Sequence, residues 1–431
     1  MRLRPTSLSF TLLLGFLVAL PSFGIDTSLP ALGATGAALR VTPAEAGLTM
    51  SFFMVGFAVA PLVYGPASDR YGRKPVVLFA CLLFTAGAIG CAMAHSLSGL
   101  LAWRLVQGAG AGASMTIAFA IVRDLFEGQA ARTKISYITM TTMIVPMLAP
   151  NVGVGLLALG GWRMIHATLA GVSLLLLLAM LVGFDESAAR DPAARLTPAA
   201  VGRNYLRVLK HPACLGYLLV GAAVFGSLFA YVSGSSLFFI NVVGLRPEQY
   251  GLIFAATSFG IMMGSFLNSR LSTMGFSHTY PLGFGLALAA TATTLLCFAS
   301  VSAATPLALI ISLLVLANLS FGLIMPNAME RTMQPLPEIA GAVGAALGFV
   351  QMVVGAVVSG LVAALHDGRS AFSMAALMAF CALFAAVSYV LLARPAERRA
   401  ALPEAAAARP EPQCQDEWLR AEFAESGEAE S

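Results

Sequence analysis

Charge is scarce in this chain. Of its 431 residues, 11% are Asp, Glu, Lys or Arg, while 58% are hydrophobic. In soluble globular domains about a quarter of all residues are charged, so this composition excludes a soluble domain. Cysteine is also scarce, and the six cysteines have no metal-like spacing, so we expect no metal site and no cofactor. The net charge of +4 is explained below by membrane topology, and no nucleic-acid partner is expected.

Long runs without any charged residue follow one another along the chain. Crossing about 30 Å of hydrocarbon takes roughly 20 helical residues. The longest run, 271–329, is interrupted by the polar segment 300–306 and therefore holds two spans. The sequence predicts an all-α membrane protein with twelve transmembrane helices. The uncharged runs are 5–25, 46–68, 75–103, 105–122, 135–162, 164–184, 211–245, 249–269, 271–329, 339–366 and 370–393.

The 25 basic residues are distributed unevenly between the connecting segments. If the N-terminus is cytoplasmic, 20 of them fall on the cytoplasmic side, four fall outside, and Arg104 remains within the membrane. Short cytoplasmic loops retain Lys and Arg, so both termini are predicted to be cytoplasmic. No A-x-A site follows the first apolar run, and we therefore expect a retained first helix rather than a signal peptide.

The longest polar segment between spans, 185–210, divides the helices six and six. The predicted parts are an N-terminal half at 1–184, this cytoplasmic loop, a C-terminal half at 211–393 and a disordered tail at 394–431. Gly65-x-x-x-Asp69 after the second span is echoed by Gly264-x-x-x-Asn268 after the eighth. Such repeats are typical of transporters whose binding site lies between two rocking halves.

The segment Gly65–Pro75, called the charged segment below, gathers four charges and two glycines between two apolar runs. We interpret it as a cytoplasmic latch. Its acid is expected to accept from helix N-termini or from an arginine across the two halves, its glycines to permit tight turns, and its basic residues to meet acidic partners or anionic lipid. The alternative is that its basic residues only set the orientation of the helices in the membrane. The latch residues are Gly65, Asp69, Arg70, Gly72, Arg73 and Lys74.

Asp26 is the one acid inside a span that cannot reach the cytoplasmic surface. It lies roughly 27 Å along the first helix, close to the outer side, with Pro30 following. An intramembrane carboxylate is costly and suggests function. The functional interpretation is a proton site or a counter-charge for a cation. The alternative is that Asp26 ends the helix and pairs with a donor at the boundary.

Arg104 lies six or seven residues into the fourth helix, at a depth comparable to that of Asp26. The two side chains could pair, and making or breaking the pair would change the proton affinity of Asp26. A structural role, with hydrogen bonds to backbone carbonyls, is the alternative.

Two neighbouring helices carry residues suited to packing or gating. After Arg104, small residues at helical spacing allow helices to approach and slide, and prolines in the fifth helix bend it. Packing without gating is the alternative for both. The residues are Gln107, Gly108, Gly110, Pro146, Pro150 and Gly153.

These motifs resemble the major facilitator superfamily. The charged segment is similar to its loop signature, and Arg104-x-x-Gln107-Gly108-x-Gly110 to its helix-four signature. More narrowly, the chain resembles the bicyclomycin-resistance (Bcr/CflA) branch of twelve-span drug:proton antiporters. The segments that carry this resemblance are Asp26-Thr-Ser-Leu-Pro30-Ala-Leu, Val122-Arg123-Asp124-Leu125-Phe126, Gly161-Trp162-Arg163, Phe229-Ala-Tyr231-Val-Ser233-Gly234-Ser235, Pro326-Asn327-Ala, Ile339-Ala-Gly341 and Leu347-Gly348-Phe349-Val-Gln351-Met352.

The resemblance implies proton-driven efflux of small amphipathic drugs across a bacterial inner membrane by a monomer. In this mechanism the substrate reaches a central cavity, and inward proton flow through Asp26 and Arg104 resets the protein. Flexible methionines and aromatic faces suit loosely specified ligands. The candidate cavity residues are Phe23, Met115, Phe119, Met140, Met143, Phe229, Tyr231, Phe238, Asn318, Asn327 and Gln351.

One stretch departs from the family pattern. Antiporters of this type usually carry Gly-Pro and paired glycines in helix five, whereas this chain has Ala149-Pro150-Asn151-Val152-Gly153. Symport or facilitated movement therefore stays open, as does a transporter of one specific neutral metabolite. A membrane-embedded enzyme such as a lipid transferase would need clustered acids or a nucleophile with its base, and no such grouping occurs in the sequence.

Overall fold

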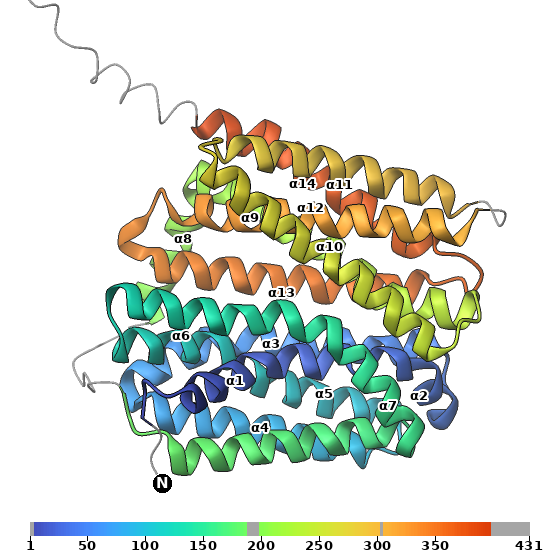
Figure 1. Cartoon of the computed structure of the whole chain (residues 1–431), viewed down its shortest axis with the longest axis horizontal. Helices are drawn as coiled ribbons and strands as arrows, with labels where there is room; N and C mark the ends of the chain where they lie inside the picture. Colours follow the sequence, from blue (N-terminus) through green and yellow to red (C-terminus); the bar gives the residue numbers. More distant parts are fainter. Residues whose placement is uncertain (1–3, 188–197, 302–304, 398–431) are drawn as a thin grey trace, which may run out of the picture.

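A computed structural model describes residues 4–187, 198–301 and 305–397, and all regular elements within these ranges are helical (Figure 1). The first half of the chain holds α1 (Leu8–Asp26), η1 (Leu29–Ala31), α2 (Leu32–Leu39), α3 (Pro43–Tyr71), α4 (Arg73–Ala92), α5 (Leu97–Ala111), α6 (Ser114–Leu125) and α7 (Gly128–Gly183). The rest holds α8 (Pro198–Lys210), α9 (Pro212–Ser236), η2 (Leu237–Val242), α10 (Pro247–Thr273), α11 (Thr279–Ala299), α12 (Leu307–Met333), η3 (Pro337–Ile339), α13 (Ala340–Leu365), α14 (Phe372–Ser388) and η4 (Tyr389–Ala393).

Eleven helical segments of the described chain are long and apolar enough to cross a membrane. One of them, α7, has 56 residues and holds two spans, because Gly160 and Gly161 leave helical geometry within it. Gly161 has φ +71°, a left-handed conformation that glycine adopts without a steric penalty. Counted with both parts of α7, the spans number twelve, and the predicted all-α membrane fold is confirmed.

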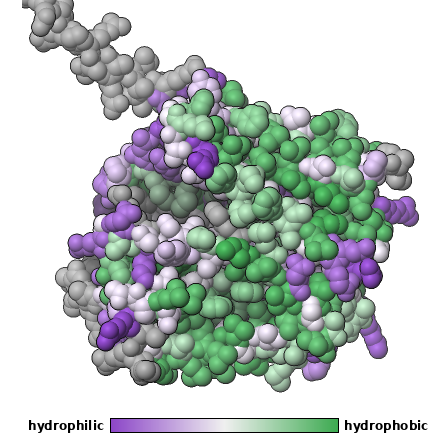
Figure 2. Space-filling model, in the orientation of Figure 1, coloured by the Kyte–Doolittle hydropathy of each residue, from purple (hydrophilic) through white to green (hydrophobic). Residues whose placement is uncertain are grey.

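The long helices lie side by side in two bundles, α1–α7 and α9–α14 (Figure 1). The bundles meet chiefly where α3 packs against α13 and where α7 packs against α10. Figure 2 shows hydrophilic residues gathered towards the ends of the helices and apolar residues over the middle. This distribution is the one expected for a protein whose helices cross a hydrocarbon layer.

The small residues of α5 allow it to lie directly on its neighbours. A Cβ added at Gly108 would come within 1.9 Å of the Phe53 carbonyl oxygen in α3, and one at Gly110 within 2.3 Å of the Phe84 nitrogen in α4. Backbone-to-backbone approach of this kind excludes any side chain larger than hydrogen. The glycines that follow Arg104 therefore bring α5 directly against both α3 and α4.

The segment predicted as a central loop contains a helix, α8, and its residues 188–197 lie outside the described part. The tail prediction falls mostly on residues 398–431, which also lie outside it.

Candidate functional site

The first span breaks at Asp26 and then continues. Helix α1 ends at Asp26, η1 and α2 follow, and together they form one span from Leu8 to Leu39. The Thr27 hydroxyl donates to the Phe23 carbonyl at 2.5 Å, and the Thr27 backbone N–H donates to the same carbonyl at 3.4 Å. Asp26 therefore lies inside the span. The helical segment continues past the end of the uncharged run, and the depth of Asp26 close to the outer side stays a prediction.

Asp26 is 6% exposed, and no other acidic side chain of the described part is buried. Within the described residues its carboxyl group takes part in no hydrogen bond or ion pair. It interacts electrostatically with Tyr231 and Tyr250, which belong to the other bundle. A buried carboxyl without a partner is costly when ionised.

Arg104 is fully buried in α5 and holds three helices together. Its Nη1 donates to the Gly24 carbonyl in α1 and to the Gln107 side chain, both at 2.8 Å, and its Nε donates to the Thr49 carbonyl in α3 at 3.3 Å. The guanidinium also lies over the Phe53 ring, 4.7 Å from its centroid. These are the backbone carbonyl contacts of the structural alternative.

The ion pair that we predicted between Asp26 and Arg104 is not formed in this structure. The predicted similarity of depth holds, since Arg104 bonds the carbonyl of Gly24, two residues before Asp26. The second terminal nitrogen of Arg104, Nη2, is buried and has no partner in the described chain. The arginine thus retains one free donor beside the turn that carries the acid.

Opposite Asp26, the second bundle presents a row of buried hydroxyl groups. Tyr231 of α9 hydrogen-bonds Thr257 of α10, and Tyr250 of α10 lies 3.1 Å from the hydroxyl of Ser235 in α9. Phe254 lies between the two tyrosines, with its ring centroid 5.6 Å from that of Tyr231 and 5.9 Å from that of Tyr250. The sequence pointed to Tyr231, but nothing local indicated that α10 would complete the group.

The proline-containing part of α7 contacts the break in α1. A Cβ added at Gly153 would lie 2.1 Å from the Thr27 carbonyl oxygen, so only glycine fits there. Pro146 and Pro150 lie within the same helix. One of the proposed gating residues, Gly153, therefore lies directly against the residue that follows Asp26, which the sequence did not indicate.

The two bundles are fastened together at the end where α2 lies. Asn151 of α7 donates to the Gly251 carbonyl of α10 at 3.3 Å, and Leu32, Ala46 and Leu237 form a small buried cluster across the bundles. Asn151 belongs to the stretch that departs from the family pattern. Its side-chain amide bonds the opposite bundle. A glycine at this position has no side chain and could not make this bond.

Arg73 is the centre of the charged segment. Its guanidinium pairs with Asp69 and, at 2.9 Å, with Asp124 at the end of α6. The Ser68 hydroxyl accepts a further bond at 2.8 Å. The prediction that Asp69 meets an arginine across the halves was wrong, because one helical turn brings Arg73 of the same bundle to it first.

The acid at the N-terminus of α4 is Glu186 rather than Asp69. Its carboxylate accepts from the backbone nitrogens of Arg73 at 2.7 Å and Lys74 at 3.2 Å, and a carboxylate at a helix N-terminus is stabilised by the unpaired N–H groups there. Gly72, with φ +100°, leaves room for the Glu186 carboxylate, since a Cβ at this position would lie 2.3 Å from a carboxylate oxygen. Gly65 makes no turn, contrary to prediction, because α3 runs through it.

The other two basic residues of the charged segment bind locally. Lys74 donates to the Leu181 carbonyl at 2.9 Å, and the Arg70 guanidinium lies 5.3 Å from the ring centroid of Tyr71. Both contacts stay within the first bundle.

The second bundle has a charged cluster of its own, which sequence reasoning missed. Arg331 at the end of α12 pairs with Glu397, which also lies 3.3 Å from His278 and accepts from the Tyr217 hydroxyl at 2.7 Å. Glu397 follows the last span much as Glu186 follows the sixth. This correspondence was visible in the sequence, but the repeat at Asn268 drew attention to a different position.

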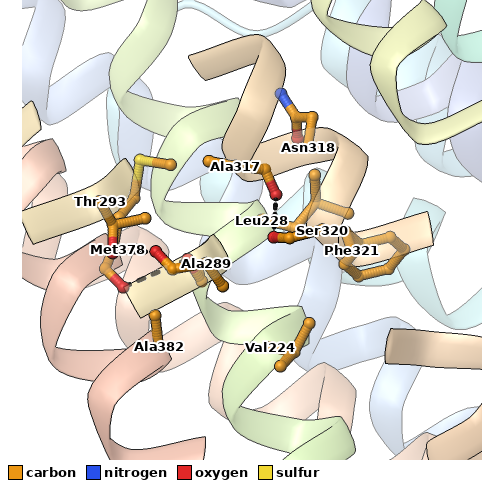
Figure 3. Close-up of a pocket in the computed structure, with 11 residues that line it drawn as sticks. Val224, Leu228, Ala289, Thr293, Ala317, Asn318, Ser320, Phe321, Met378 and Ala382 are labelled. Atoms are coloured by element: carbon orange, nitrogen blue, oxygen red, sulfur yellow. Dashed lines mark hydrogen bonds between the residues drawn. The ribbon is translucent and has the colours of Figure 1, made fainter. Parts of the chain in front are cut away.

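The predicted cavity residues are not gathered at one pocket. Asn318 lines a pocket inside the second bundle with Thr293 and Ser320 (Figure 3). The pocket has about 10 Å³ in which the centre of a water molecule fits, enough for about one water. In this structure Asn318 therefore faces a water-sized pocket. The Asn327 amide binds Asn268 at 2.7 Å and ties α12 to α10.

Five further candidates are packed against neighbours. Phe229 lies 4.7 Å from Phe225 between ring centroids, Phe238 lies 5.1 Å from Phe239, and Tyr231 belongs to the hydroxyl row. Gln351 is 7% exposed and contacts the Met325 sulfur at 3.8 Å, while Phe23 packs on Val145 and Ala149.

The remaining candidates are more open. Met115 and Met140 are 41% and 53% exposed, and Phe119 is half-buried. The side chain of Met143 lies outside the described part.

An apolar groove of about 240 Å³ lies between the bundles, along α3 and α13. Its walls are aliphatic and aromatic, from Val55, Ala58, Val59, Phe349, Val353, Ala356 and Val357. A groove of this composition suits an apolar ligand or a lipid chain.

Twelve spans in two bundles, with a buried acid facing the opposite bundle, define a multi-pass membrane transporter. The Major Facilitator Superfamily model matches residues 11–357, and the chain belongs to this superfamily. Transport by alternating access follows from the fold, and the alternative of a membrane enzyme is set aside.

Curated relatives agree with this assignment. The chain is 30% identical to a bicyclomycin resistance protein homolog of Haemophilus influenzae, over 89% of this chain and 96% of that protein. It is 28% identical to the multidrug resistance protein MdtL of Escherichia coli, over 78% of this chain and 83% of MdtL. The predicted resemblance is confirmed.

Solved structures show the same fold. A bacterial homolog of the human lysosomal transporter Spinster, in an inward-facing and occupied conformation, matches with TM-score 0.72 and 15% identity, over 92% of this chain and 97% of that one. The xylose transporter XylE from E. coli matches with TM-score 0.68 and 15% identity, over 89% and 97%.

Proposed function

We propose that this protein exports small amphipathic drugs across the bacterial inner membrane in exchange for protons. The observation that carries the proposal is Asp26, a buried carboxyl group in a broken span that faces the opposite bundle. The names of the bicyclomycin and multidrug resistance relatives support drugs as the substrate class. The protein works as a monomer with both termini in the cytoplasm.

In this mechanism Asp26 is neutral while it faces the hydroxyl row of the second bundle, because that environment offers no cation. Release of the proton leaves a buried negative charge, and the unpartnered Nη2 of Arg104, in the same bundle, is a cationic donor that can compensate it. Asp26 then turns from the second bundle towards its own. The contact between bundles therefore depends on the proton, and this dependence couples proton flow to rocking.

The substrate is recognised by apolar surface rather than by fixed charges. The groove between α3 and α13 offers an apolar approach at the junction of the bundles, and Met115 and Met140 offer adaptable contact. A transporter of one neutral metabolite on the same fold would instead need hydrogen-bonding groups directed at its ligand. Of the predicted polar contacts, the Asn327 amide already hydrogen-bonds Asn268, and Asn318 lines a pocket with room for about one water.

Resistance and proton release test the proposal together. We expect expression in a pump-deficient bacterium to raise resistance to several unrelated amphipathic drugs, and those drugs to release protons from energised inverted vesicles. Resistance without proton release would reject the coupling while leaving efflux standing. Uptake of one neutral metabolite, with no resistance to any drug, would reject the proposed substrate class.

A further inference from the structure

Helix α8 is held against the second bundle in a fixed orientation. Val208 is fully buried in a cluster with Leu218 and Val343. On the adjoining face, Arg207 pairs with Glu338 at 2.7 Å. These two contacts prevent rotation about the helix axis, so the direction of each remaining side chain is determined.

Two leucines of α8 are directed away from the bundle. Leu206 is 50% exposed and Leu209 is 48% exposed. Residues three apart lie on the same face of a helix, so the two form one apolar strip. Neither can be buried by turning α8, because Val208 already occupies the buried face.

A basic strip runs next to these leucines. Arg203 and Lys210 are both exposed, and their spacing of seven places them on one line along the helix. At 100° per residue this line lies between the leucine strip and Arg207. The free faces of α8 are thus apolar on one side and cationic on the next, the pattern of a helix that lies in a membrane interface.

The position of α8 agrees with that pattern. It runs across the ends of the long helices rather than alongside them (Figure 1). His211 alone separates Lys210 from Pro212, where the membrane-spanning helix α9 begins. A helix joined so directly to a span, and lying across its end, is parallel to the bilayer surface and at its level.

We propose that α8 is an interfacial helix that binds anionic phospholipid. Arg203 and Lys210 contact the headgroup phosphates, and Leu206 with Leu209 enter the outer part of the acyl layer. The helix thereby anchors the connection between the two bundles to the lipid surface. This binding is independent of the substrate and of proton coupling.

Lipid retention by the full-length protein tests the basic strip. Native mass spectrometry is done with phosphatidylglycerol and phosphatidylcholine added in turn. We expect the unaltered protein to prefer phosphatidylglycerol, and Arg203→Gln with Lys210→Gln to lower this preference by about fivefold for each residue. The matched control, Arg246→Gln with Arg369→Gln, removes two exposed arginines from the opposite end of the helix bundles. We expect this control to retain the preference for phosphatidylglycerol.

Equal preference in all three proteins would overturn the proposal. So would displacement of the bound lipid by millimolar inorganic phosphate, since a small anion would then suffice.

Fluorescence quenching tests the apolar strip without changing any charge. A tryptophan introduced as Leu209→Trp is expected to be quenched by brominated phosphatidylcholine in vesicles and protected from iodide in the water. The control Gln129→Trp, an exposed position at the start of α7, is expected to show the opposite behaviour, after subtraction of the native tryptophans. If bromolipid left the signal of the Leu209→Trp variant unchanged, protein or water would cover this face, against the proposal.

Discussion

Arg104 donates to the carbonyl oxygen of Gly24 at 2.8 Å. The bond joins a fully buried cation to the last turn of α1, which ends at Asp26. The guanidinium donates from Nε and Nη1 to the carbonyls of Thr49 and Gly24 and to the Gln107 side chain. Its Nη2 is left without a partner in the described chain. Arg104 therefore holds α1 and α3 in place, and its unpartnered Nη2 is the donor that the proposed coupling role requires.

Asp26→Asn is expected to abolish drug-induced proton release while the protein still inserts and binds drug. The amide has nearly the shape of the protonated acid but cannot give up a proton, so the exchange step is lost. Proton release from inverted vesicles is the measurement, with Glu248→Gln, an exposed acid at the start of α10, as the control. Undiminished proton release by Asp26→Asn would remove Asp26 from the coupling mechanism.

Arg104→Lys is expected to lower the transport rate by about tenfold or more although the charge is kept. Lysine has one compact ammonium group and cannot bond Gly24, Thr49 and Gln107 in the fork geometry of arginine, and a hydrogen bond to a charged group contributes about 1.5–3 kcal/mol. Drug transport into inverted vesicles measures the rate. A full rate with lysine would show that positive charge alone is required.

Gly153→Ala is expected to destabilise the protein by about 1–3 kcal/mol, the usual cost of overpacking. The added Cβ would lie 2.1 Å from the Thr27 carbonyl oxygen and would push α7 away from the break in α1. Thermal unfolding in detergent is the measurement. Gly155→Ala is a close control, because a Cβ there meets no atom within 4 Å. If both variants melted alike, the contact between α7 and α1 would have no energetic importance.

Asp69→Ala is expected to slow transport with little loss of drug binding, and Asp124→Ala to slow it further. Both acids pair with Arg73, but the Asp124 side chain is 21% exposed and that of Asp69 is 46% exposed, so the pair with Asp124 is less screened by water. Rates and binding affinities are measured on the same preparation. Unchanged rates in both variants would reduce the charged segment to a topological marker.

The spans were predictable because hydropathy is a local property. A run such as 211–245 is recognisable as a span from its own residues, and α9 with η2 fills it almost completely. Boundaries were less predictable where a polar residue lies inside a span. At Asp26 the uncharged run stops but the helical segment continues to Leu39, since local hydroxyl bonds and packing satisfy the backbone there.

The candidate site was predictable in part. Asp26 and Arg104 stand out in sequence because charge is costly in a membrane, yet their separation in this structure depends on α3 and on Gln107, which supply acceptors to the arginine. The cavity residues were chosen by type alone. Type does not tell whether an asparagine faces a substrate or, as Asn327 does, another asparagine of the same bundle.

The sequence by itself determined the class of this protein: a transporter of twelve apolar helices with a buried acid, a buried arginine and a charged segment, because each of these is a property of neighbouring residues. The tertiary structure alone decided the partners. It brought Glu186 to the start of α4, Asn151 to Gly251 and the hydroxyls of α9 and α10 to Asp26. These residues are far apart in the chain, and only the packing of whole helices brings them together.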